Sequence, residues 1–243
     1  HTSGHMGVAN TKALEIMGID ENTLDPVGGF IGRNEDGSPN GYLEETAFTA
    51  NASFVKQPDF DDMVKLIHQA EQIYFKYGIS TVQDGFTGYK EWNLLKELSD
   101  RNLLTADVVS YIDINSCPEI LENNTEYSNY KNNLKIGGYK LFLDGSPQGR
   151  TAWMTKPYKN SEDYCGYPIY NDKDVLSFVK KSINEEQQLL CHCNGDAAAE
   201  QFIGAYEKAD VELNTHHNFR PVLVHGQLAT PQQMERLAPL GMI

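Results

Sequence analysis

Two histidines that end short apolar runs are the residues of this chain best suited to chemistry. His192 lies in the run Gln188–Asn194, and His225 ends the run Pro221–His225. Runs of this length are consistent with buried β-strands. Neutral imidazoles on neighbouring strands commonly hold zinc or a similar divalent ion, so the pair predicts a metal site. For His192 alone, an inert, hydrogen-bonded core histidine is an equally good interpretation.

Two cysteines flank His192, and side-chain alternation separates them from it. Successive side chains of a strand point to opposite faces, so His192 points away from Cys191 and Cys193. We therefore expect the two thiols to pack against outer helices and not to form a three-ligand Cys-His-Cys site. All four cysteines, with Cys117 and Cys165, are expected to be buried free thiols because their spacing fits neither a zinc ribbon nor a disulfide framework.

A lysine inside a third apolar run is a candidate third member of the site. Alternation within Gly137–Asp144 places Lys140, Phe142 and Asp144 on the inward face. A lone buried ammonium is costly and usually needs a partner or a shifted pKa. Carboxylation by CO2 would convert it into a carbamate whose two oxygens can bridge two metal ions. An ion pair with Asp144 or Asp84 is the simpler alternative.

The same alternation argument, applied to all three runs, gives Lys140, His192 and His225 a common parity, which means that their side chains are expected on the same face of the sheet. In Pro221–His225 it pairs His225 with Leu223 on one face. We therefore expect the lysine and the two histidines to point into one shared space.

Strand and helix patterns alternate from residue 58 onward. The expected strands are Ile79–Asp84, Ala106–Ile112, Gly138–Leu143, Gln188–His192 and Pro221–His225. The expected helices are Asp59–Tyr77, Tyr89–Arg101, Pro118–Asn133, Asp172–Glu186, Ala197–Ala209 and Pro231–Leu240. This alternation predicts an α/β fold with a parallel sheet, and polar residues at strand ends favour a (β/α) barrel. Such a barrel would be incomplete, with one more strand starting at Met242. An open doubly wound sheet is the alternative, although no glycine-rich phosphate loop supports its nucleotide-binding version.

The first residues differ in character from the rest. We expect residues 1–56 to be an irregular loop or flap insertion over the active site, and residues 57–243 to be the partial barrel. Within the flap, a short helix is predicted near Asn10–Met17, and Asp36-Gly37 predicts a hairpin turn.

Charge and hydropathy narrow the class of partner. Lys and Arg number 20 against 34 Asp and Glu, which gives a net charge of −14. Nucleic acid and anionic membranes require a cationic face, so we expect neither as a partner. No apolar run of about 18 residues predicts a membrane span, and no signal peptide is visible. We expect a cytoplasmic protein with a small-molecule substrate; a homo-oligomer remains open.

These motifs together resemble the amidohydrolase superfamily, specifically the family 3 branch that includes N-substituted formamide deformylases. The matching stretches are Ser3–Leu14, Gly28-Gly29, Asp36–Gly41, Leu43-Glu44, Gly78–Asp84, Tyr139–Ser146, Gly149–Ala152, Pro157-Tyr158, His192–Ala197 and Val224–Gln227. They run in family order along nearly the whole chain. His1–Met6, which could be mistaken for a cloning scar, therefore reads as native.

The resemblance implies a TIM-type (β/α)8 barrel of metal-dependent hydrolases, of which this chain holds about strands 2 to 6 and the start of strand 7. It implies that Lys140 is the carboxylated bridging lysine and that His192 and His225 are metal ligands on the fifth and sixth barrel strands. One or two divalent ions, zinc first, would be bound. Two departures matter: the His-X-His pair of the first strand and the catalytic Asp of the eighth are absent. Val224 also replaces a glutamate found in many relatives.

The implied function is hydrolysis of a non-peptide C–N bond, in an amide, formamide or related group, by a metal-activated water. Candidates for orienting the substrate are His5, Asp144, Arg150 and Asp196, and for each a structural role such as helix capping is an equal alternative. The competing function class is a non-catalytic small-molecule, sugar or peptide-binding module on a partial barrel.

The missing ligands give a first prediction about this chain by itself. Because only Lys140, His192 and His225 of the implied ligand set are present, the 243-residue chain should hold metal poorly and be inactive as an amidase. Metal stoichiometry and amide turnover decide the matter. Two tightly bound metals, or turnover comparable to an intact relative, would contradict the expected truncation or the ligand set.

Overall fold

The larger part of the chain is a parallel sheet whose five strands are neighbours in chain order. In this computed structural model, which describes residues 5–51, 58–214 and 219–243, the order is β4-β5-β6-β7-β8. The strands are β4 (Thr81–Thr87), β5 (Asp107–Asp113), β6 (Leu134–Phe142), β7 (Gln188–Cys193) and β8 (Val222–His225). All four pairings are parallel. Each expected strand is therefore confirmed, within a few residues at its ends.

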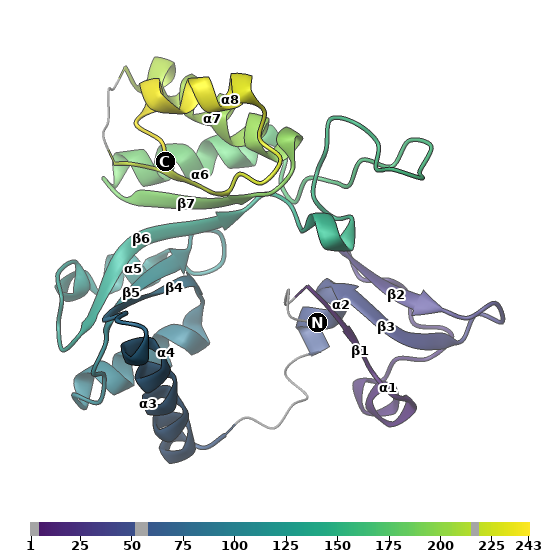
Figure 1. The fold of residues 1–243 in the computed structure, drawn as a ribbon, viewed down its shortest axis with the longest axis horizontal. Coiled ribbons are helices and arrows are strands. Elements are labelled where there is room, and N and C mark those ends of the chain that lie inside the picture. Colours follow the sequence, from purple (N-terminus) through teal and green to yellow (C-terminus); the bar gives the residue numbers. More distant parts are fainter. Residues whose placement is uncertain (1–4, 52–57, 215–218) are drawn as a thin grey trace.

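Helices that precede, connect and follow the strands cover the outer face of the curved sheet (Figure 1). They are α3 (Phe60–Lys76), α4 (Tyr89–Asp100), α5 (Glu119–Asn123), α6 (Asp172–Asn184), α7 (Asp196–Leu213) and α8 (Pro231–Leu237), with short 3₁₀ turns at Thr125–Tyr127, Pro147–Gly149 and Ala238–Leu240. A curled parallel sheet with helices outside is half of a barrel, which agrees with the partial TIM-type barrel that we expected.

One helix is much shorter than predicted. The segment Pro118–Asn133 forms only α5 and the 3₁₀ turn Thr125–Tyr127. The helix ends at Asn124, whose φ of −133° and ψ of 47° are not helical, and the left-handed φ values of 45° and 68° at Asn132 and Asn133 keep the end of the segment from being α-helical. The single long helix was therefore a wrong prediction.

The end of the chain continues the parallel sheet. Ile243 donates its N–H to the Pro221 carbonyl at 2.8 Å and accepts from the Leu223 N–H at 2.7 Å. These two bonds lie on the outer edge of β8, where the next strand of a barrel would pair. The strand expected to start at Met242 thus has its first contacts, although it is too short to be a strand here.

The hydrophobic core lies between the outer face of the sheet and its helices. Cys191 and Cys193 are fully buried within it, as alternation predicted. Cys117 is also buried, and no disulfide joins the four cysteines. Cys165 is only partly buried, because it lies in the long loop after β6 and not in the core, so the expectation of four buried thiols is wrong for it.

The N-terminal segment is more regular than the expected flap. It contains β1 (Met6–Val8), β2 (Gly29–Arg33) and β3 (Pro39–Glu45) in one antiparallel sheet of order β1-β3-β2. Helices α1 (Thr11–Met17) and α2 (Thr46–Thr49) accompany it. The predicted short helix and hairpin are both confirmed.

This small sheet has its own core, which accounts for its regularity. Leu14, Ile31 and Leu43 are buried together in a cluster separate from the core of the parallel sheet. The predicted boundary at residue 56 and the motif residues Ser3 and Gly4 lie outside the described residues. Within the described ranges, no helix is both long and apolar enough to cross a membrane.

A glycine of β6 sets how closely β7 can approach. Gly138 has a φ of +140°, and a Cβ atom there would lie 2.2 Å from the Gln188 carbonyl oxygen. Gly138→Ala should therefore push β6 and β7 apart and lower the free energy of unfolding by about 2 kcal/mol or more. Urea unfolding measures the loss. The control is Gly85→Ala in β4, where a Cβ atom meets nothing within 4 Å and φ is not left-handed; an equal loss in both variants would contradict the clash.

Candidate functional site

Lys140 and His192 lie on the inner face of the sheet, opposite to the helices. In the β6–β7 register Phe142 pairs with His192 and Lys140 pairs with Leu190, and paired residues of a parallel sheet share a face. The Phe142 and His192 ring centroids are 4.8 Å apart, and the Lys140 Nζ lies 4.7 Å from the Phe142 centroid. The predicted alternation is therefore confirmed for both strands.

The Lys140 amine is buried, and the described residues give it no counter-charge. Only 5% of the residue is exposed, and no carboxylate lies within ion-pair distance of it in the part of the chain that the structure describes. Asp84 instead accepts from the Thr87 hydroxyl at 2.7 Å, and Asp144 accepts from backbone groups. The simpler alternative, an ion pair to either aspartate, is therefore not what the structure has. Burial lowers the pKa of Lys140.

His225 joins this face for a reason that alternation misses. The β7–β8 register pairs His225 with Cys193, and Leu223 with Cys191, on the helix-covered face. Yet the His225 ring centroid lies 4.7 Å from that of His192. The His225 backbone has a φ of 73°, in the left-handed region, which breaks the alternation at the strand end. The prediction that alternation places His225 on the inner face was therefore wrong. The two imidazoles share one space because of this backbone turn.

The hydrogen bonds of His192 fix which ring nitrogen can bind a ligand. Its Nε2 lies 2.8 Å from the Gly145 carbonyl oxygen, which can only accept a hydrogen bond. The Asn194 amide nitrogen also lies 3.1 Å from Nε2, but it donates to the same Gly145 oxygen at 2.8 Å, so the contact with the carbonyl assigns the proton to Nε2 and the lone pair to Nδ1. Burial, followed by the charge of Lys140, lowers the pKa of His192 to about 3, so the ring is neutral near neutral pH.

Asp144 is a positioning residue at the end of β6. Its carboxylate, 1% exposed, accepts from the backbone N–H groups of Asn194 at 2.9 Å, Gly195 at 2.7 Å and Trp153 at 3.0 Å. Burial raises the pKa of Asp144 to about 6, against the lowering effect of these bonds. The carboxylate joins the end of β6 to the β7–α7 turn, and its suggested role in orienting substrate stays a prediction.

The N-terminal sheet brings a second group to His192. The His5 ring centroid lies 5.9 Å from that of His192, and its Nδ1 lies 2.9 Å from Glu45 Oε2. The other Glu45 oxygen accepts from the Thr151 hydroxyl at 2.8 Å. The bond to Glu45 raises the pKa of His5. Glu45 and Thr151 were missed by the sequence reasoning, although both lie within or directly beside the stretches that carry the family resemblance.

The inner face carries nitrogen donors of the kind that metal ions bind. No group of three or more His, Cys, Asp or Glu side chains converges as a cage anywhere in ranges 5–51, 58–214 and 219–243. Two neutral imidazoles and the buried amine of Lys140 do converge. Such nitrogen donors fit a divalent ion, and a carbamate on Lys140 would add the oxygens that such ions also bind.

Comparison with known proteins identifies the family. The amidohydrolase family model matches residues 1–243. The chain belongs to the amidohydrolase family. Protein LONG AFTER FAR-RED 3 of Arabidopsis thaliana is 25% identical over 99% of this chain and 43% of its own length. N-substituted formamide deformylase of Arthrobacter pascens is 26% identical over 98% of this chain and 45% of its own length. The amidohydrolase chain therefore spans less than half the length of these relatives.

A solved structure supports the same fold. An uncharacterized metal-dependent hydrolase from Pyrococcus furiosus superposes on this amidohydrolase chain with a TM-score of 0.70, at 24% identity, over 97% of this chain and 47% of the other. Putative amidohydrolase YtcJ of Bacillus subtilis (strain 168) is 24% identical over 96% of this chain and 44% of its own length.

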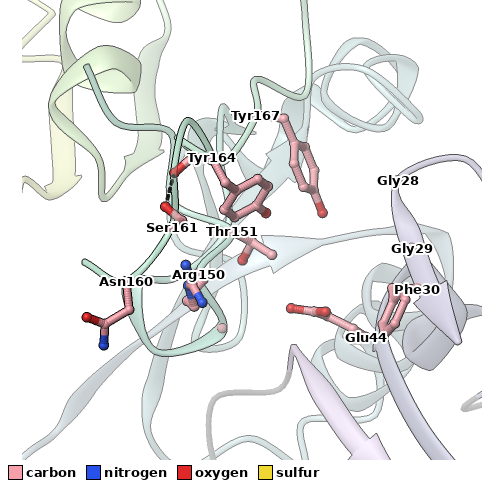
Figure 2. Close-up of a pocket in the computed structure, with 11 residues that line it drawn as sticks. Gly28, Gly29, Phe30, Glu44, Arg150, Thr151, Asn160, Ser161, Tyr164 and Tyr167 are labelled. Carbon is pink, nitrogen blue, oxygen red and sulfur yellow. Dashed lines mark hydrogen bonds between the residues drawn. The ribbon is translucent and has the colours of Figure 1, made fainter. Parts of the chain in front are cut away.

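The last two candidate residues lie away from the inner face of the amidohydrolase sheet. Asp196 begins α7, and its carboxylate accepts from the Thr155 N–H at 2.8 Å and from the Thr155 hydroxyl. Arg150 is exposed and lines a cavity of about 800 Å³ between the N-terminal sheet and the loop after β6 (Figure 2). A substrate role remains a prediction for both, and Arg150 is the better placed.

The strained backbone of His225 gives a test that needs no assay of function. A left-handed conformation costs a residue with a Cβ atom about 1–2 kcal/mol, and a β-branched residue more. His225→Gly should therefore raise the free energy of unfolding by about 1 kcal/mol, while His225→Val should lower it. Urea unfolding of both variants beside the parent chain measures the difference. Equal stability of the glycine and valine variants would show that the turn is not strained.

Proposed function

We propose that this amidohydrolase chain is part of a metal-dependent hydrolase that cleaves the C–N bond of an amide, a formamide or a related non-peptide group through a metal-activated water. The observation that carries the proposal is the convergence of Lys140, His192 and His225 at one edge of a half-barrel. The similarity to N-substituted formamide deformylase supports the class of bond. The metal-dependent hydrolase of the same fold agrees with the need for a metal.

The metal would be held by the nitrogen donors of the inner face. His192 offers Nδ1, because Nε2 donates to Gly145, and His225 offers its ring from the next strand. Lys140 would contribute as a carbamate, with zinc as the first expectation for the metal. A divalent ion at this place would lower the pKa of a bound water and polarise the carbonyl of the substrate.

The surrounding residues of the chain have roles that follow from their contacts. The Gly145 carbonyl holds the His192 ring in one tautomer, and Asp144 fixes the turn that follows β7. His5, bonded to Glu45, can carry a proton beside His192. A proton held on His5 Nε2 could pass to a leaving nitrogen, a role that general acids have in amide hydrolysis.

A binding module without catalysis is the competing interpretation, and the burial of Lys140 argues against it. A module with no metal would be expected to pair a buried lysine with a carboxylate, because an isolated ammonium is costly. Lys140 has no such pair among the described residues.

Variants of the three convergent residues test the proposal in the full-length protein. His192→Ala and His225→Ala should each lose bound metal and at least about 100-fold in amide hydrolysis, because a ligand is removed. Lys140→Ala should behave alike and recover part of its activity with short carboxylic acids, which can replace the carbamate oxygens. Metal analysis and turnover are both measured.

Two variants on the same framework serve as controls for these measurements. Lys135→Ala removes a lysine from the same strand, and His68→Ala removes a histidine from α3 that bonds the Leu103 carbonyl at 2.8 Å. Both should keep metal and turnover. Full metal content and activity in His192→Ala or His225→Ala would refute the metal assignment.

A further inference from the structure

The cavity beside Arg150 contains two opposite charges that have no ion-pair partner among the described residues. Arg150 lies on one side of it and Glu44, from β3, on the other, and Figure 2 shows the Glu44 carboxylate pointing toward the loop that carries Arg150. Neither side chain makes an ion pair or a side-chain hydrogen bond in the part of the chain described here. In a chain of net charge −14, a guanidinium without a carboxylate is unexpected.

Arg150 is nevertheless held in place. Its guanidinium carbon lies 5.5 Å from the Tyr158 ring centroid and 5.8 Å from that of Tyr164, within the range of cation–π contacts. Its backbone has a φ of 59° and caps the 3₁₀ turn Pro147–Gly149. A fixed, fork-shaped donor with its face on aromatic rings presents its N–H groups to a planar acceptor such as a carboxylate.

Glu44 is complementary to a cation. The residue is half-buried, and burial followed by the charge of Glu45 raises its pKa. An ammonium group beside it would relieve that unfavourable ionisation. Tyr167, which also lines the cavity, has a pKa raised to about 12, so its hydroxyl stays protonated and can donate to a ligand.

The charged cavity adjoins a second cavity that reaches the residue beside His192. A second cavity of about 450 Å³ shares Gly28, Thr151 and Tyr167 with the first and is also lined by Gly145. Gly145 is the residue whose carbonyl holds His192. A ligand head group between Arg150 and Glu44 could therefore extend its other end toward the inner face of the sheet.

We propose that this cavity binds a zwitterionic α-amino-acid head group, its carboxylate on Arg150 and its ammonium toward Glu44, and that the substrate is a small amide carrying such a head group at the end away from the scissile bond. This inference names the substrate class of the proposed function. It rests on that function only for the bond that is cleaved, and not for the ligand of the cavity. A purely anionic ligand would be repelled by Glu44, and a purely cationic ligand by Arg150.

The test measures binding to the 243-residue chain by titration calorimetry. The probe is Nε-formyl-lysine, with three relatives: its α-N-acetyl form, which is anionic, its α-carboxamide, which is cationic, and the form capped at both ends. The zwitterion should bind at least about 10-fold more tightly than each singly capped probe, because each cap removes one charged hydrogen bond. This comparison needs no variant.

Variants then assign each charge of the head group to its residue. Arg150→Met should weaken the zwitterion and the acetylated probe by about 10-fold or more and leave the carboxamide unchanged. Glu44→Gln should weaken the zwitterion and the carboxamide and leave the acetylated probe unchanged. Lys159→Met and Glu162→Gln, which remove exposed charges from the same loop without lining the cavity, should change binding by less than about 2-fold.

The outcomes separate this inference from the proposed function. His192→Ala should still bind the zwitterion, since the head group does not touch the metal ligands. Head-group binding without hydrolysis by the full-length protein would leave the assignment of the cavity standing and count against the proposed reaction. The inference would be overturned if all four probes bound equally or if none bound. It would also be overturned if the acetylated probe bound as tightly as the zwitterion and Glu44→Gln left the binding of the zwitterion unchanged.

Discussion

The Asp144 carboxylate is the interaction on which the candidate site depends. It accepts three backbone N–H groups that come from the β7–α7 turn and from the loop after β6. Leaving one buried donor unsatisfied costs about 1–3 kcal/mol, so the carboxylate fixes both segments together. Gly145 follows it directly, and there is no room for a side chain there: a Cβ atom would lie 2.0 Å from the Thr151 hydroxyl oxygen. The position of the Gly145 carbonyl, and with it the His192 tautomer, therefore follows from how Asp144 is held.

The same corner also attaches the N-terminal sheet to the half-barrel. Thr151 donates its hydroxyl to Glu45, and Glu45 in turn bonds His5, whose ring lies beside His192. Glu45 has a φ of 48°, an unfavourable conformation for a glutamate, at the junction of β3 and α2. Strained residues that are held by several contacts are often found at functional sites. Glu45 and His225, one from each sheet, are both of this kind.

Much of the half-barrel could be predicted from the sequence because its signals are local. Each strand is an apolar run between helical patterns, and alternation placed Lys140 and His192 correctly since both lie inside regular strands. His225 reached the inner face through a backbone angle that no pattern of residue types reveals. The antiparallel N-terminal sheet was read as an irregular flap because β1 has only three residues and the glycines of β2 and β3 interrupt the alternation. The contacts of Glu45 with Thr151 and His5 join residues 106 and 40 positions apart, which local patterns do not encode.

The charges on the inner face favour neutral nitrogen over protonated nitrogen. Burial is the largest cause that lowers the pKa of Lys140, His192 and His225, and the positive charge of Lys140 lowers the pKa values of both imidazoles further. Protonating any one of them therefore makes protonation of the others harder. A neutral imidazole carries the lone pair that a divalent ion needs, and a neutral amine is the form of lysine that reacts with CO2. Since no carboxylate of residues 5–51, 58–214 or 219–243 pairs with Lys140, each group keeps the form that metal binding requires.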